Sequence, residues 1–183
     1  MHPFASLAPH LLRKLFYISL AATISIAVVL NVADEPLVTS LAPYGIVSFE
    51  LAGTPERAQA IIESWDERAR LFAAFSLGYD YLYMLAYSTV LGLGCILAAQ
   101  AIRSVEWPLA ALGIPLVWGM WLAALFDAVE NLSLILILLA GASSSIWPAV
   151  ARQCALIKFG LLFFGLVYAF YGLVVGIVGR LKH

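Results

Sequence analysis

Residues 109–140 read LAALGIPLVWGMWLAALFDAVENLSLILILLA. An α-helix needs roughly 20 apolar residues to cross a hydrocarbon layer of ~30 Å. This stretch is long enough to do so, and its charged residues, Asp127 and Glu130, lie close together. The stretch therefore predicts a transmembrane helix, and it raises the question of why that helix carries two acids.

Three further stretches, at about 15–33, 71–100 and 148–179, are also long and apolar. Of the 183 residues, 63% are hydrophobic and 11% are charged, whereas soluble domains are about half apolar and a quarter charged. The sequence thus predicts an all-α integral membrane protein. We expect a single membrane domain over residues 1–183, built as a four-transmembrane-helix bundle.

The first span is interpreted as a retained helix. Arg13 and Lys14 precede it, as in a signal peptide, but the apolar run is long and Asn31 is a poor residue before a cleavage after Ala33. The distribution of Lys and Arg favours both termini in the cytoplasm, with a plasma (inner) membrane location. Five basic residues would lie on the cytoplasmic side: Arg13, Lys14, Arg103, Arg180 and Lys182. Four would lie on the outer side: Arg57, Arg68, Arg70 and Arg152.

An extramembrane segment, residues 34–70, joins the first two spans. Its first part, 34–53, contains two prolines and two glycines, so we expect no regular element there, only an apolar loop on the membrane surface or over the bundle. Thr54 and Pro55 then predict the start of an amphipathic helix. Its apolar face has helical spacing: Ala58, Ile61, Ile62, Trp65 and Ala69. Two Trp-Pro pairs, in 106–110 and 146–150, predict span starts with proline at the first helical position.

Ionisable side chains in three of the spans are predicted to form one polar layer. Asp127, Glu130 and Asn131 fall within an arc of about 100° on their helix. Asp80 in 71–100 and Lys158 in 148–179 lie at a matching depth, roughly 13–20 Å from the outer span ends at 1.5 Å per residue. Lys158 also shares a stripe with small residues, which permits close helix packing.

This layer has unequal charge, with three carboxyl groups against the one ammonium of Lys158. A charge at mid-bilayer costs about 2.5–3.5 kcal/mol on insertion scales. We therefore expect some carboxyl groups to hold protons, or a cation or cationic ligand group to complete the site. Tyr83 and Tyr87 are candidate donors to it. The candidate ligand- or ion-binding residues are Asp80, Asp127, Glu130, Asn131, Lys158, Tyr83 and Tyr87.

The function predicted from this layer is binding or transport of a proton, a cation or an amine-bearing small ligand. One alternative is an intramembrane enzyme that acts on a lipid or isoprenoid, with the carboxyl groups as acid and base. A second alternative is a structural accessory subunit whose polar core maintains helix register. The sequence motifs identify no family, no catalytic residue and no cofactor.

Metals and partners are constrained by composition. The three histidines lie near the termini, and Cys95 and Cys154 form no C-x-x-C pair, so no metal site of His or Cys is expected inside the spans. The net charge of -1 provides no basic surface for nucleic acid. Membrane lipids are the expected partners, with a homo-oligomer or a larger membrane complex also possible for a chain of four spans.

Overall fold

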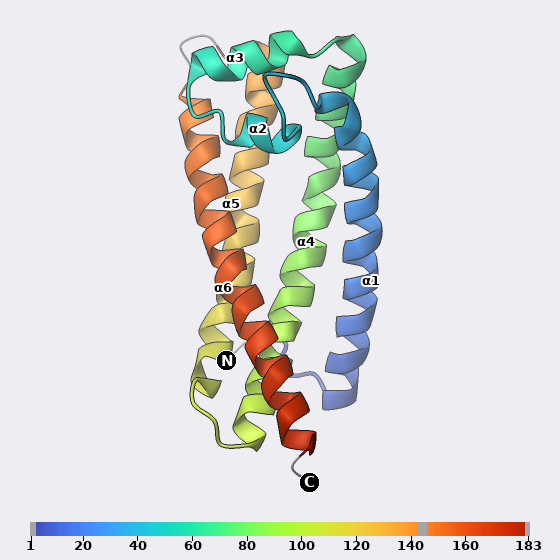
Figure 1. The fold of residues 1–183 in the computed structure, drawn as a ribbon, viewed down its shortest axis with the longest axis vertical. Helices are drawn as coiled ribbons and strands as arrows, with labels where there is room; N and C mark the ends of the chain where they lie inside the picture. The colour runs from blue at the N-terminus through green and yellow to red at the C-terminus, as the bar shows by residue number, and fades with distance from the viewer. Residues whose placement is uncertain (1–2, 143–145, 182–183) are drawn as a thin grey trace. The chain divides into compact units, whose positions relative to one another are not determined.

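The computed structural model describes residues 3–142 and 146–181, so His2, Lys182 and His183 lie outside the described residues. The described chain contains four long helices (Figure 1): α1 (Pro9–Asp34), α4 (Glu67–Ser104), α5 (Gly113–Ala140) and α6 (Trp147–Leu181). Between α1 and α4 lie two short helices, α2 (Ile46–Glu50) and α3 (Pro55–Ser64). Two 3-10 turns precede α2 and α5, η1 (Glu35–Leu37) and η2 (Ala110–Leu112).

Four helices are long and apolar enough to cross a membrane: Pro9–Leu37, Glu67–Ser104, Ala110–Ala140 and Trp147–Gly179. They correspond to the four predicted spans: the first two are several residues longer at both ends, and the last two agree within one residue. The predicted all-α fold with four spanning helices, and with short helices between the first two, is confirmed. It indicates an integral membrane protein.

The described chain divides into two compact units. Unit 1 comprises residues 1–23, 85–124 and 159–183, and unit 2 comprises residues 24–84 and 125–158. Each of the four long helices therefore contributes one segment to each unit, and α2 and α3 belong entirely to unit 2.

Unit 1 is packed with apolar and small side chains. Its buried cluster is Leu12, Leu93, Cys95, Ile96, Ala98, Ile102, Val117, Tyr168 and Val175. A Cβ atom at Gly172 of α6 would overlap the Cα and Cβ atoms of Ala98 on α4. The glycine at this position thus permits the two helices to approach closely, and the G-x-x-x-G run that begins at Gly172 packs within the chain.

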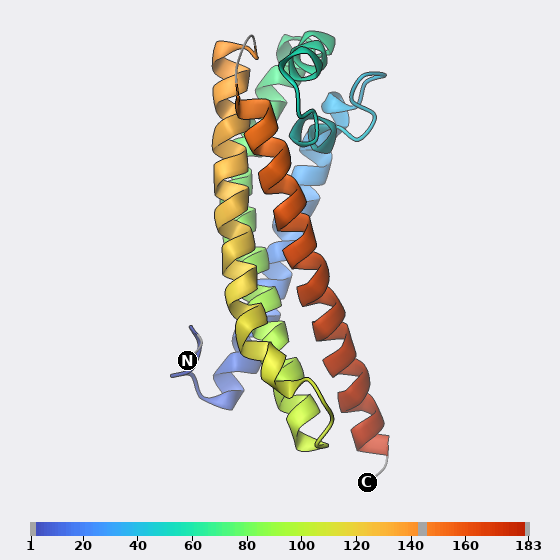
Figure 2. The same cartoon turned by 90° about the vertical axis from the view of Figure 1, so that its left-hand side faces the viewer.

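Unit 2 has a core that joins its membrane helices to α2 and α3. The turned view in Figure 2 shows α5 and α6 side by side in this unit, with the short helices to the right of α6. The core contains Phe49 of α2, Trp65, and residues of α4, α5 and α6. The expected amphipathic helix is α3: Thr54 caps it by accepting from the Arg57 N–H, and Ala58, Ile61 and Ile62 are its buried residues. The apolar face of α3 covers this core.

The expectation of no regular element in 34–53 is wrong, because η1 and α2 form there. Gly45 has a φ of 53°, a left-handed conformation that favours glycine, and a Cβ at this position would overlap the carboxylate of Asp34. The Asp34 side chain instead accepts a hydrogen bond of 2.7 Å from the Ile46 N–H. The glycine and the aspartate together start a helical turn that local composition does not predict.

The two Trp-Pro pairs have different outcomes. Pro148 lies in the first turn of α6, as expected. Pro108 is not the first residue of α5: the next residue, Leu109, has a φ of 77°, and α5 begins only at Gly113. The left-handed residue prevents the helix from starting at the proline.

Candidate functional site

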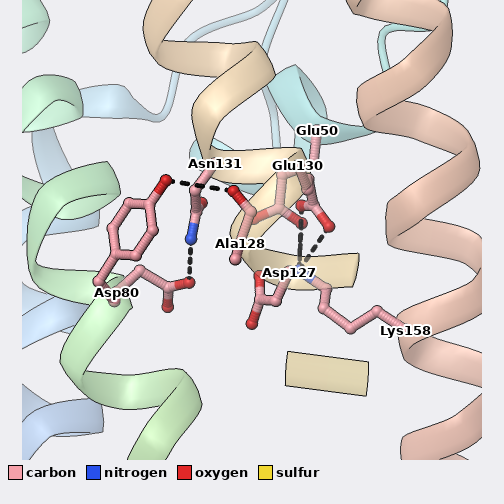
Figure 3. A network of polar contacts seen from close by, with 8 residues as sticks. Glu50, Asp80, Asp127, Ala128, Glu130, Asn131 and Lys158 are labelled. Atoms are coloured by element: carbon pink, nitrogen blue, oxygen red, sulfur yellow. Dashed lines mark hydrogen bonds and ion pairs between the residues drawn. The ribbon is translucent and has the colours of Figure 1, made fainter. Parts of the chain in front are cut away.

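The centre of the candidate site is the ammonium group of Lys158, which lies in unit 2. Its Nζ donates to Asp127 Oδ1 at 3.0 Å and to Glu130 Oε1 at 3.0 Å, with Glu130 Oε2 at 2.9 Å. A third carboxyl group, that of Glu50, has its Oε2 atom 3.7 Å from the same nitrogen. Figure 3 shows these side chains converging from α2, α5 and α6.

Helix α5 directs three polar side chains into the site. Glu130 and Asn131 lie three and four residues after Asp127, so all three side chains project from one face of the helix. Their exposed fractions are 1%, 0% and 2%, whereas Trp118 on the opposite face is 53% exposed. The predicted inward stripe of α5 is thus present in the structure, with the large aromatic residue directed outward.

The network continues from α5 to α4. Asn131 Nδ2 donates to Asp80 Oδ2 at 2.7 Å, and the hydroxyl of Tyr81 donates to the Ala128 carbonyl at 3.1 Å (Figure 3). Asp80 is therefore joined to the lysine cluster by way of α5, through the side-chain amide of Asn131. Tyr81 was not among the predicted donors.

Glu50 is the member of this cluster that sequence reasoning missed. The sequence places Glu50 in the predicted extramembrane segment, whereas the structure buries it at the end of α2. Helix α2 is held by the Asp34–Ile46 hydrogen bond and by an edge contact between Phe49 and Trp65, whose ring centroids are 5.3 Å apart. Burial raises the pKa of Glu50 above its ordinary value, and the neighbouring Lys158 ammonium opposes this change.

A sequence signal for Glu50 exists but is short. The residue is a lone acid in the apolar run IVSFELAG, residues 46–53. An apolar stretch is expected to be covered by other parts of the protein. A single acid in such a stretch is therefore unusual for a free loop. Five helical residues are too few to reveal which face is buried, so the pattern does not point to Lys158.

A small cavity lies beside the carboxyl groups, within unit 2. Its volume is about 60 Å³, and its lining residues come from α1, α2, α4 and α5: Leu30, Ile46, Glu50, Ser76, Leu77, Asp80 and Asn131. Among the described residues, neither Ser76 Oγ nor Glu50 Oε2 has a hydrogen-bond partner, although both atoms are buried. Because buried polar atoms are usually paired, these two atoms give the cavity a polar wall with unused acceptor capacity.

The remaining predicted residues are placed as follows. Tyr83 is half-buried in unit 2, and Tyr87 is buried in unit 1. Over residues 3–142 and 146–181, no group of three or more His, Cys, Asp or Glu side chains has a geometry suited to a metal ion.

Comparison with protein-family models, with curated proteins and with solved structures finds no match to this chain. Interpretation of the site therefore depends on its chemistry. Three carboxyl groups, those of Glu50, Asp127 and Glu130, contact the ammonium group of Lys158, and a fourth, that of Asp80, joins the cluster through Asn131. If all four were ionised, the cluster would carry three unbalanced negative charges.

Proposed function

We propose that this protein is an integral membrane protein that reversibly binds a proton or another small cationic species in the carboxylate cluster of unit 2. The observation that carries the proposal is the charge imbalance, four carboxyl groups near one ammonium group. The added carboxyl group of Glu50 makes this imbalance larger than the sequence alone suggests. Binding of this kind is the basic step of a transport or sensing cycle.

The imbalance creates affinity for positive charge because isolated ions are costly in a medium of low dielectric constant. One ammonium group can neutralise one carboxylate, and the remaining carboxyl groups must be neutralised by protons or by a bound cation. Each such event removes repulsion between neighbouring carboxylates. The site is therefore expected to respond to pH, to cations, or to both.

The enzyme alternative is less well supported by the contacts of Lys158. In that interpretation the ammonium group stabilises negative charge that develops on a substrate. Here its Nζ atom already contacts Asp127, Glu130 and Glu50. A substrate would have to displace these carboxylates, so we favour binding over catalysis.

A thermal melt of the detergent-solubilised protein tests the proposal. Na⁺, Mg²⁺, Ca²⁺, small amines and pH are screened on the wild type, Asp80→Asn and Glu130→Gln. The amides preserve shape but remove charge, so the variants should fold and lose the stabilisation. A ligand at 100 times its Kd adds ~2.7 kcal/mol to the free energy of unfolding, which is readily measured. Glu56→Gln, at an exposed acid of α3, is the matched control and should respond like the wild type.

For Glu50, the direction in which stability should change with pH can be stated. The charged groups that face it are those of Lys158, Glu130, Asp127 and Asp80. Its pKa is raised in the folded protein, so its contribution to stability is complete at low pH and is lost as the pH rises through the folded value. Glu50→Gln should remove that part of the decline. If no cation, amine or pH step changes the wild-type melt, the binding proposal fails and a structural role for the cluster is favoured.

A further inference from the structure

We infer that the cavity beside Glu50, Ser76 and Asp80 binds the primary ammonium group of a small amine or of an amine-bearing lipid headgroup. This inference rests on the proposed function, and it narrows the cationic species to one chemical class. It also assigns a position in the structure, the cavity of about 60 Å³ in unit 2.

The first argument is the set of acceptors on the cavity wall. Among the described residues, Ser76 Oγ is buried without a hydrogen-bond partner, and the residue Ser76 is only 4% exposed. Glu50 Oε2 is also buried without a hydrogen bond, and its ion-pair contact with Lys158 Nζ is long, at 3.7 Å. Asp80 uses its Oδ2 atom to accept from Asn131, and a carboxylate has further lone pairs on both oxygens. A buried polar atom without a partner costs stability, so a donor placed here would relieve a cost that the protein carries without a ligand.

The second argument is that acceptors from more than one helix line the cavity, an arrangement that suits a group with several N–H donors. A primary ammonium group has three N–H donors and no acceptor, like the head of a lysine side chain. The cavity offers Glu50 from α2 and Ser76 and Asp80 from α4. Mg²⁺ instead requires six oxygen ligands in near-octahedral geometry, and no group of three or more His, Cys, Asp or Glu side chains among the described residues is arranged for a metal ion, so these acceptors fit an ammonium group better.

The third argument is size and the apolar part of the lining. A water molecule needs roughly 10–15 Å³ of such volume, so a cavity of about 60 Å³ has room for a few non-hydrogen atoms. Besides the polar residues Glu50, Ser76, Asp80 and Asn131, its wall has an apolar part formed by Leu30, Ile46 and Leu77. A short alkyl stem attached to the ammonium group would contact these side chains.

A free amine and a lipid headgroup such as ethanolamine present the same ammonium chemistry to this cavity. The first experiment therefore compares soluble cations on the full-length protein in detergent. Ammonium, methylammonium and ethylammonium chloride should raise the melting temperature in a saturable manner, whereas tetramethylammonium chloride, which has the same charge but no N–H donor, should not. Equal stabilisation by tetramethylammonium would overturn the inference, because it would show a response to charge alone.

The second experiment uses Ser76→Ala. Loss of one hydrogen bond to a charged group should weaken methylammonium binding by on the order of tenfold, without lowering the melting temperature in the absence of amine. Ser88→Ala is the matched control, since Ser88 is a buried serine of the same helix in unit 1 whose hydroxyl donates to the Leu85 carbonyl. Unchanged methylammonium affinity in Ser76→Ala would overturn the assignment of the cavity.

The third experiment identifies the source of the ammonium group. The protein is reconstituted in nanodiscs of phosphatidylethanolamine or of phosphatidylcholine, whose headgroup nitrogen is fully methylated. Greater stability in phosphatidylethanolamine that Ser76→Ala abolishes indicates the lipid headgroup, and a response to methylammonium alone indicates a soluble amine. Stabilisation by Na⁺ or by pH without any response to primary ammonium would overturn this inference and leave the proposed function intact. No response to any cation or pH step would overturn both.

Discussion

Unit 1 and unit 2 are built from segments of the same four long helices, yet their interiors differ. Unit 2 buries Glu50, Asp127, Glu130 and Lys158, whereas the described part of unit 1 has no charged side chain among its buried residues. Unit 1 depends on close contact between small residues, as at Gly172 and Ala98. One half of each helix thus supplies packing, and the other half supplies a site with α2 and α3 over it.

This difference between the units predicts why substitutions in each should lower the stability of the fold. In unit 2 the dominant cost should be electrostatic, because removal of one charge leaves its partners buried and unpaired. In unit 1 the dominant cost should be steric, because close helix contacts such as Gly172 with Ala98 leave no space for added atoms there. The predictions below test this distinction in order of expected effect.

The largest effect is expected for Lys158→Met in unit 2. This change removes the ammonium group that Asp127, Glu130 and Glu50 share, and it should lower the free energy of unfolding by about 3–5 kcal/mol. Denaturant unfolding in detergent measures the change. Met120→Leu, at a fully buried site in unit 1, is the control and should cost less than about 1.5 kcal/mol.

The double variant Lys158→Met with Glu130→Gln sharpens this result. Glu130 has both carboxyl oxygens within 3.0 Å of the lysine nitrogen, so neutralising it should recover much of the loss. A double variant as unstable as Lys158→Met alone would show that Glu130 is not the principal counter-ion. Asp127 would then be the next candidate, since its carboxylate lies at 3.0 Å from Lys158 Nζ.

An intermediate effect is expected in unit 1 for Gly172→Ala. The added Cβ would overlap the backbone and side chain of Ala98, and such overpacking costs about 1–3 kcal/mol. Gly160→Ala, on the same helix in the same unit, is the matched control, because a Cβ there meets nothing within 4 Å. Equal stability of the two variants would contradict the proposed steric basis of unit 1.

The sequence predicts the spans and much of the polar layer for a physical reason. Membrane helices are long, so their apolar length and helical period are easily recognised. Because a buried charge is costly, Asp127, Glu130 and Lys158 are expected to face one another inside the bundle. Matched polar depths on three helices are enough to predict that these side chains lie in one layer, but not every contact between the helices.

Glu50 could not be placed by the same reasoning. Its position depends on contacts between residues distant in sequence, such as Ile46 with Asp34 and Phe49 with Trp65. No periodicity extends over the five residues of α2. The start of α5 is mispredicted for another reason, since the positive φ of Leu109 occurs at a residue type that does not favour it, so the sequence gives no signal for it.

Tyr81 illustrates a limit of helical periodicity. Residues three and seven positions after Asp80 share its stripe, which selects Tyr83 and Tyr87. The hydroxyl that reaches α5 belongs instead to Tyr81, the residue next to Asp80. A helix that faces more than one neighbour presents more than one inward stripe, and the sequence does not specify which neighbour lies over each stripe.

The smallest effect compares one tyrosine hydrogen bond in each unit. Tyr81 donates to the Ala128 carbonyl at 3.1 Å in unit 2, and Tyr168 donates to the Leu109 carbonyl at 3.2 Å in unit 1, with the Ala110 carbonyl at 3.4 Å as a second and longer contact. Tyr81→Phe and Tyr168→Phe should each lower the free energy of unfolding by about 0.5–1.5 kcal/mol, the usual net value of a neutral hydrogen bond. The two losses should be similar, because only charged groups distinguish the interiors of the two units. A loss at Tyr81 well above that at Tyr168 would show that Tyr81 is coupled to the charged cluster, and the cluster would then extend from the carboxyl groups to the tyrosine.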